Sequence, residues 1–342
     1  MKTYGVMLIG CGHIGMQHLL DIYYRENITI VAVVDKDIEL AKEAARRCGS
    51  AYTTDYRDFL TSDKVDIVII ATYTDTHLEI LKDCLAHHKH VLCEKPIAGN
   101  LSDGKEFIEL VKSSPEKVLI AHILRHNSSY IKVRELVKSG IIGELRLVRM
   151  IQNHHSMNWP RYQRLLKDCS PTIDCGVHYY DILSWISGSD ITEVSGIGTI
   201  TQPDAPQMNY TLATIRLANG CIAFYEAGWG QNLRSSNLKE FIGTKGRITL
   251  ELKDSRSRDR EEGDLITVYH LDTGSYETIN IEAKYKNMYG QLETLIDMIE
   301  NNTPGNPTID EVWKSFVSAQ AADKAIRSEK TIKIDEFEKR II

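Results

Sequence analysis

The most constraining feature of the sequence is a glycine-rich turn between a short apolar strand and a helix. Residues 5–9 form the apolar run, and Gly10, Gly12 and Gly15 follow it before a helical stretch that reaches Tyr24. In a G-x-G-x-x-G turn the first glycine allows the tight turn, the second lets backbone approach a pyrophosphate, and the third lets helix pack closely on strand. The free N–H groups and positive dipole of the helix N-terminus favour the same anion. This pattern predicts a dinucleotide-binding βαβ unit.

A carboxylate stands where such a unit needs one. A second strand, residues 29–34, ends in Asp35, at about the 20-residue separation expected for an acid that accepts from the adenosine ribose 2′-hydroxyl. Asp35 would repel a 2′-phosphate and therefore favours NAD, whereas the adjacent Lys36 could meet such a phosphate, which leaves NADP open. His13 and Ile14 lie inside the turn, so we expect them to contact the cofactor too.

Alternating strands and helices continue to about residue 121. Helical patterns over 38–48 and 56–60 are followed by a buried strand over 65–71, and further strands end at Cys93 and Ala121. A chain that alternates in this way forms a doubly wound parallel sheet. We therefore predict an α/β protein that begins with a Rossmann domain over residues 1–122.

Polar residues follow the later strands of this sheet, at the edge where ligands bind in such folds. Residues 72–77 follow one strand, and Glu94 and Lys95 follow the next, before Pro96. Proline restricts the residue before it, so Lys95 should be extended, and a cis Lys95–Pro96 bond stays open. His77 either caps the next helix or contacts ribose or nicotinamide. The cofactor contacts expected from this edge are Thr72, Thr74, His77, Glu94 and Lys95.

Together these residues resemble the Gfo/Idh/MocA family of NAD(P)-dependent sugar and inositol oxidoreductases. The glycine turn, Asp35, Ala71-Thr72 with His77, and the Val-Leu-Cys-Glu-Lys-Pro segment over 91–96 carry the resemblance. Residues 172–181 resemble the family's D-x-G-x-H-x-x-D segment, so the resemblance spans nearly the whole chain. Two positions depart from the family pattern: Tyr73 stands where proline is common, and His88 where glycine is common.

The second half of the chain has a different pattern, which predicts a substrate-binding and oligomerisation domain over residues 123–342. A helix over 129–139 is followed by alternating segments whose spacing fits a large, mainly antiparallel sheet in an α+β domain. The resemblance implies that the open face of this sheet pairs subunits into homodimers or homotetramers. Residues 255–264 read as a mixed-charge connector. The expected strands are 144–152, 194–201, 210–217, 221–227, 239–242, 247–252, 265–270 and 276–281.

The expected catalytic residues are Asp174 and His178, joined by Lys95 from the first domain. If a helix begins at Asp174, positions 174 and 178 share one face. Oxidising a secondary alcohol requires a base for the hydroxyl proton while hydride leaves for the nicotinamide, and histidine suits that task. Lys95 would bind the same hydroxyl and keep His178 neutral by like-charge repulsion, and Asp174 would orient substrate or Lys95.

We expect the substrate pocket to be lined by polar residues of the second domain. Specificity should reside in loops such as residues 154–168. A metal site built from His154, His155, Cys169, Asp174, Cys175 and His178 is conceivable, but the spacing matches no recognised zinc pattern, so we predict no metal. The predicted substrate-binding residues are Arg125, Asn153, His154, His155, Trp159, Asp174 and His178.

Composition restricts the partners and the location. The formal net charge is −6 and the basic residues are dispersed, which predicts a small-molecule substrate and no nucleic acid. No apolar run approaches the roughly 20 residues that span a bilayer, and seven cysteines without a Cys-x-x-Cys pair suit a reducing cytoplasm. Two other functions stay open: a glycoside hydrolase or lyase that uses NAD transiently, and a dinucleotide-binding sensor. The intact Lys95, Asp174 and His178 count against the sensor.

Overall fold

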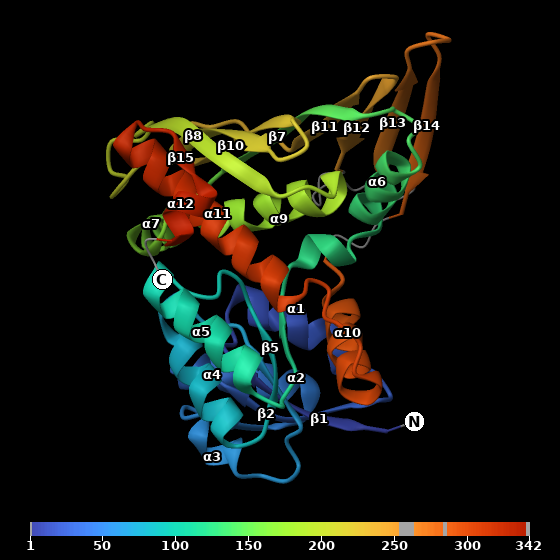
Figure 1. Cartoon of the computed structure of the whole chain (residues 1–342). Coiled ribbons are helices and arrows are strands. Elements are labelled where there is room, and N and C mark those ends of the chain that lie inside the picture. Colours follow the sequence, from blue (N-terminus) through green and yellow to red (C-terminus); the bar gives the residue numbers. More distant parts are fainter. Residues whose placement is uncertain (1, 253–262, 283–285, 340–342) are drawn as a thin grey trace. The chain divides into compact units, whose positions relative to one another are not determined.

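Two sheets organise the chain in its computed structural model, one of six strands and one of nine (Figure 1). The structure describes residues 2–252, 263–282 and 286–339. Most of the connector predicted over 255–264 therefore lies outside the described residues. None of the described helices combines the length and the apolar character that crossing a membrane requires.

The six-stranded sheet is parallel throughout, in the order β3-β2-β1-β4-β5-β6. β1 and β4 are buried along their whole length, as expected for strands covered on both faces. This confirms the predicted Rossmann-like α/β sheet. Its strands are β1 (Tyr4–Ile9), β2 (Ile28–Val34), β3 (Ala51–Thr53), β4 (Ile67–Ile70), β5 (His90–Cys93) and β6 (Val118–Ile120).

Local sequence signals set the ends of the helices around this sheet. The Asp37 side chain caps α2 by accepting from the Glu39 N–H at 2.9 Å, and Gly49 ends that helix in the left-handed region at φ 72°. Asn100 caps α5 in the same way. The helices are α1 (His13–Ile22), α2 (Ile38–Cys48), α3 (Arg57–Leu60), the short 3-10 turn η1 (Thr74–Thr76), α4 (His77–Ala86), α5 (Leu101–Ser113) and α10 (Met288–Asn301).

The chain divides into two compact units, and the first is discontinuous. Residues 1–123 and 287–313 form the first unit, and residues 124–286 and 314–342 form the second. The sequence division assigned residues 287–313 to the second domain. They belong with the first sheet because α10 packs against α1, β5 and β6, and its apolar face, including Leu292 and Leu295, is fully buried in that core.

The nine-stranded sheet is antiparallel except where β10 runs parallel to β7. Its order is β14-β13-β12-β11-β7-β10-β9-β8-β15, and it confirms the predicted large, mainly antiparallel sheet. Its strands are β7 (Leu145–His155), β8 (Ile191–Thr199), β9 (Tyr210–Leu217), β10 (Ile222–Gly230), β11 (Leu238–Gly243), β12 (Gly246–Glu251), β13 (Asp264–His270), β14 (Tyr276–Ile281) and β15 (Ile332–Lys333).

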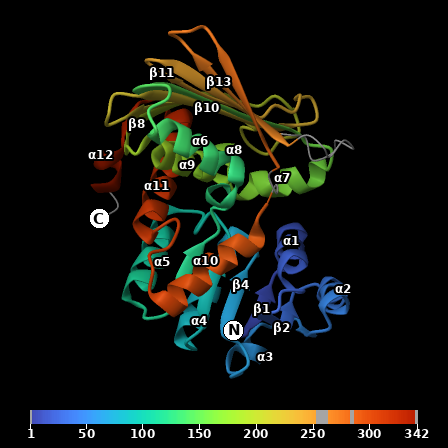
Figure 2. The same cartoon turned by 90° about the vertical axis from the view of Figure 1, so that its right-hand side faces the viewer.

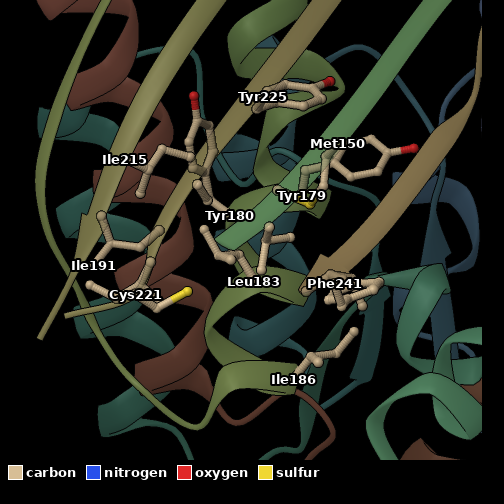
Figure 3. Close-up of a cluster of buried hydrophobic side chains, with 14 of the residues drawn as sticks. Met150, Tyr179, Tyr180, Leu183, Ile186, Ile191, Ile215, Cys221, Tyr225 and Phe241 are labelled. Carbon is tan, nitrogen blue, oxygen red and sulfur yellow. The ribbon is translucent and has the colours of Figure 1, made fainter. Parts of the chain in front are cut away.

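Helices cover one face of this sheet, and none of those in the described residues covers the other (Figures 1 and 2). Side chains of alternate strand residues meet α9 on the covered face, where Tyr225 stacks on Tyr179 at 4.8 Å and meets Tyr180 edge-on (Figure 3). The helices of this unit are α6 (Ser128–Lys138), α7 (Trp159–Asp168), α8 (Pro171–Asp174), α9 (Gly176–Ser187), α11 (Ile309–Ser328) and α12 (Ile334–Lys339); α11 begins in the first unit.

Candidate active site

The carboxyl ends of the parallel strands lie in register. Ile9 of β1 is paired with Val34 of β2 and with Ile70 of β4, and Ile70 is paired with Cys93 of β5. The residues that follow these four strands therefore emerge along one edge of the sheet. They are the glycine turn, Asp35 with Lys36, the loop over 72–77, and Glu94 with Lys95.

Each of the three glycines in the turn suits its position for a different physical reason. Gly10 has φ +95°, and a Cβ there would lie 2.5 Å from the Ala71 carbonyl oxygen. A Cβ on Gly15 would lie 1.8 Å from the Gly10 carbonyl oxygen, whereas one on Gly12 would meet nothing within 4 Å. Gly12 starts α1 with no side-chain cap, so backbone N–H groups at this open end suit a pyrophosphate. The turn therefore fits a dinucleotide, with His13 and Ile14 beginning the helix.

Asp35 is fixed by backbone at the same edge. Its Oδ2 accepts from the Cys11 N–H at 2.8 Å and its Oδ1 from the Asp37 N–H at 2.9 Å. A carboxylate has about four acceptor positions, so these two bonds leave capacity for a ribose hydroxyl. Burial, and then the Asp35 charge, raise the pKa of the Cys11 thiol to about 12. Lys36 is exposed.

The loop after β4 is held by His77. This ring is fully buried, with Nδ1 3.0 Å from the Pro96 carbonyl oxygen and Nε2 3.3 Å from the Thr72 carbonyl oxygen. Burial lowers its pKa. Both ring nitrogens therefore face backbone carbonyl oxygens, and His77 is the first residue of α4. Of the two predicted roles, a place at the start of the helix fits this arrangement better than contact with ribose or nicotinamide. Thr72 accepts from the Thr76 hydroxyl at 2.7 Å, and Thr74 begins η1.

Glu94 and Lys95 leave β5 half-buried, and the Lys95–Pro96 bond is cis, the isomer that the sequence left open. The Glu94 Oε1 lies 2.8 Å from Nε2 of His18, a fully buried residue of α1. His18 was not among the residues predicted from the sequence. Its spacing gave a signal, because a residue three positions after Gly15 shares the helix face that packs on the sheet.

In the second unit, Asp174 and His178 do not share one helix as predicted. Asp174 is the last residue of α8, and α9 begins at Gly176 after a turn at Cys175. The His178 N–H bonds the Cys175 carbonyl oxygen at 3.1 Å, three residues back rather than four, so the regular α-helical ladder is interrupted between the two helices. Cys175 keeps helical angles, so the chain continues in nearly the same direction. Asp174 and His178 are both half-buried.

Polar residues at the end of β7 lie on opposite faces of the nine-stranded sheet. His154 lies on the helix-covered face, with its ring 6.2 Å from the Tyr162 ring of α7. Burial lowers the pKa of His154, and the negative charge of Asp174 opposes that effect. Within the described residues, His154 Nε2 is buried without a hydrogen-bond partner.

Asn153 and His155 point the other way, because neighbouring residues of a strand alternate between faces. Asn153 donates to Glu226 of β10, and the His155 ring bonds the Leu233 carbonyl at 3.1 Å. The prediction that these two residues line one pocket with His154 therefore differs from the observed arrangement.

Comparison with known proteins identifies the family. The model of the Gfo/Idh/MocA oxidoreductase family with an NAD-binding Rossmann fold matches residues 4–122, and that of the Gfo/Idh/MocA C-terminal domain matches residues 130–249. The chain belongs to the Gfo/Idh/MocA family. This confirms the resemblance seen in the sequence, and with it an NAD-dependent oxidoreductase.

Relatives of this family member cover nearly its whole length. Myo-inositol 2-dehydrogenase of Thermotoga maritima is 24% identical over an alignment of 340 residues that covers 96% of this chain and 98% of the relative. Inositol 2-dehydrogenase of Rubrobacter xylanophilus is 27% identical over 254 residues, 71% and 70% of the two chains. A solved structure of scyllo-inositol dehydrogenase from Lactobacillus casei with NAD(H) and scyllo-inositol has a TM-score of 0.79 at 20% identity, covering 98% of this chain and 100% of that one.

Two predicted substrate residues of this oxidoreductase have structural partners. Arg125 makes a bidentate ion pair with Asp181 of α9, at 2.8 Å from Nε and 2.7 Å from Nη2, with side-chain exposures of 3% and 2%. Trp159 is buried in a cluster with Trp229, and its indole N–H donates to Asp204 at 2.8 Å. The sequence did not reveal either pairing, because the partners lie 56 and 45 residues away.

Lys239 is a second residue that the sequence analysis missed as a candidate. It is fully buried on β11, where Nζ donates to the Ile151 carbonyl at 2.9 Å and to Asn237 and lies 4.6 Å from the Tyr179 ring centroid. Burial lowers its pKa well below the usual value. In the sequence Lys239 is one polar residue in an alternating strand, which gives no sign that it faces inward. No group of three metal-ligating side chains occurs in the part of the chain that the structure describes.

Proposed function

We propose that the protein is an NAD-dependent dehydrogenase that transfers hydride between nicotinamide and a secondary hydroxyl or ketone of a sugar, sugar derivative or cyclitol. The observation that carries the proposal is the single sheet edge that brings the glycine turn, Asp35 and Lys95 into register. Because curated relatives are named inositol 2-dehydrogenases, inositols are the first substrates to test.

The first domain is proposed to hold the cofactor. The open backbone at Gly12 and the N–H groups of α1 suit the pyrophosphate, and Asp35 suits the adenosine ribose. A carboxylate opposes a 2′-phosphate, so NAD is preferred over NADP. When bound, the dinucleotide supplies the hydride acceptor or donor.

Lys95, His178 and Asp174 are proposed to handle the proton. His178 accepts the hydroxyl proton as general base, since a neutral imidazole can take it near working pH. Lys95 donates a hydrogen bond to the same oxygen and stabilises negative charge that develops there. Asp174 orients the substrate.

His154 is proposed to contact the substrate from the end of β7. Its buried Nε2 has capacity for a hydrogen bond, and a polyol hydroxyl can satisfy it. Tyr162 of α7 flanks the ring. This replaces the broader predicted pocket, since Asn153, His155, Trp159 and Arg125 have the other partners described above.

Three further proposals concern organisation. The helix-free face of the nine-stranded sheet exposes Ile197 and Ile222, at 65% and 46%, and we propose that it pairs with the same face of a second copy to form a homodimer or homotetramer. The substrate-binding role is assigned to the second unit, residues 124–286 and 314–342. A cytoplasmic location suits the seven cysteines, all of which are free thiols.

The test is reduced-nicotinamide absorbance while the purified protein is offered NAD or NADP with inositols, other polyols, aldoses and glycosides. Net reduced cofactor with a polyol or aldose is the expected result. Glycoside cleavage without net reduced cofactor would replace the dehydrogenase by a hydrolase or lyase. Dinucleotide binding with no turnover of any compound would instead favour a sensor.

Substitution of the proton-handling residues tests the mechanism. His178→Ala should lower kcat about 10²–10⁴-fold, because general acid–base groups contribute that much, with little change in NAD binding. Lys95→Ala should be comparably damaging to kcat. Since both act on one hydroxyl, the double variant should be hardly worse than either single one. Near-wild-type turnover in His178→Ala, or losses that multiply, would contradict the assignment.

A further inference from the structure

Two buried histidines hold the chain on either side of Lys95. His18 Nε2 lies 2.8 Å from the Glu94 carboxylate, and His77 Nδ1 lies 3.0 Å from the Pro96 carbonyl oxygen. Both rings are fully buried. His77 and Glu94 were predicted as cofactor contacts, whereas His18 is not among the expected cofactor or substrate contacts. The residue that they enclose is the one assigned to the reacting hydroxyl.

The chemistry of the partners fixes which nitrogen donates. A carboxylate only accepts hydrogen bonds, so the proton that faces Glu94 resides on Nε2 of His18. Both ring nitrogens of His77 face carbonyl oxygens, and the shorter distance, 3.0 Å from Nδ1 to Pro96 against 3.3 Å from Nε2 to Thr72, favours the proton on Nδ1. Burial lowers the pKa of His77, which keeps that ring neutral. Each imidazole is therefore a directional donor, and the two act on opposite sides of Lys95.

His18 also connects this segment to the cofactor helix. The N-terminus of α1 is the open end at Gly12, and His18 lies on the same helix. A short α-helix is a rigid element, so the position of the pyrophosphate-binding end and the position of Glu94 are mechanically linked. The helix that receives the dinucleotide thereby also sets the strand end that carries Lys95.

We propose that His18 is a positioning residue for Lys95. Through Glu94 it fixes the strand end from which Lys95 projects, while His77 fixes the other side through Pro96. The inference rests on the role given to Lys95 under the proposed function. The rival view is that the His18–Glu94 bond only stabilises the fold.

His18→Gln and His18→Asn form a matched pair that separates these views. A glutamine amide reaches the place of Nε2 and can still donate to Glu94, whereas an asparagine amide reaches only the place of Nδ1. His87→Leu is the control, because His87 is an exposed histidine at the end of α4 in the same unit. Each variant is measured for kcat and KM with NAD, and for its NAD dissociation constant.

A third measurement requires no substrate. The rate at which an amine-acylating reagent labels Lys95 is followed by mass spectrometry of the intact, folded enzyme. This rate reports the environment of the Lys95 amine whether or not the protein oxidises a polyol. Failure of the proposed function, seen as no turnover by the wild type, is thus distinguishable from failure of the His18 inference.

We expect His18→Asn to lower kcat about 10–100-fold, since small misplacements of a reacting group cost that much, with KM for NAD within about 3-fold. Its Lys95 labelling rate should change by about 3-fold or more, while His18→Gln and His87→Leu stay near wild type in both. Adding Glu94→Gln to His18→Asn should cause little further loss, because the two residues act in series. Wild-type kcat and labelling in His18→Asn, or equal losses in the Asn and Gln variants, would overturn the proposal.

Discussion

The two units place their candidate residues by different rules. In the parallel sheet, Ile9, Val34, Ile70 and Cys93 are register partners, so whatever follows each strand arrives at one edge. In the nine-stranded sheet, Asn153, His154 and His155 are consecutive residues of β7, and the pleat sends the middle one to the helix-covered face and its neighbours to the other. Residues far apart in the sequence thus lie at one edge in the first case, whereas consecutive residues are separated in the second.

The largest effect in the second unit is expected from substitution of Arg125. Arg125→Leu should lower the free energy of unfolding by about 3–5 kcal/mol, because it leaves the Asp181 carboxylate buried without its ion-pair partner. Urea denaturation followed by tryptophan fluorescence measures the loss. Arg125→Leu combined with Asp181→Leu should recover part of it. A stable Arg125→Leu variant with a raised KM would instead return Arg125 to the substrate pocket.

The split at the end of β7 gives the next largest effect. His154→Ala should lower kcat/KM for the polyol about 10–100-fold, whereas His155→Ala should stay within about 3-fold, because the two rings lie on opposite faces of the sheet. Steady-state kinetics of the two variants under identical conditions decides the point. Equal losses in the two variants would mean that His154 and His155 contribute alike to the reaction, although they lie on opposite faces of the sheet.

Asp35 tests the first unit. Asp35→Ser should narrow or reverse the preference for NAD over NADP, by about 10-fold, because it removes both an acceptor for the ribose hydroxyl and a charge that opposes a phosphate. The measurement is kcat/KM with each cofactor. A wild-type preference for NADP would show that Lys36 dominates this strand end.

The smallest effect is the response of stability to acid. Burial lowers the pKa of His77, His90 and His154 below the ordinary 6.5. The unfolded chain then binds more protons than the folded one below pH 6.5, so the free energy of unfolding falls as pH falls, by at most about 1.4 kcal/mol per pH unit for a fully buried histidine such as His77. His90 is partly exposed and should contribute less.

Denaturation midpoints at pH 7.5, 6.5 and 5.5 measure this slope. The loss should be confined to the interval below pH 6.5, and His77→Gln should reduce it. An unchanged midpoint between pH 6.5 and 5.5 would contradict the prediction.

The sequence predicted the first sheet and its edge because each signal there is local. A glycine turn, a strand-ending acid and a strand-ending lysine are read from a few neighbouring residues, and the parallel register does the rest. The second sheet was also predictable as a set of alternating segments, since period-2 burial is local too.

What the sequence could not supply depends on partners far along the chain. The Arg125–Asp181 pair, the Trp159–Asp204 bond and the inward-facing Lys239 each require knowing which strand or helix lies opposite. The break between α8 and α9 appears in the structure as the bond from the His178 N–H to the Cys175 carbonyl. These residues are of ordinary types, so only their packing in the fold shows whether they belong to a functional site or stabilise the structure.

The discontinuity of the first unit has a consequence for synthesis of the protein. α10 supplies Leu292, Leu295 and Met298 to the core around β1, yet it is translated after the strands of the other unit. While the ribosome is still producing residues 124–286, the nascent Rossmann sheet lacks this cover and exposes apolar surface to chaperones. The dinucleotide-binding unit can therefore complete its core only after α10 has been translated.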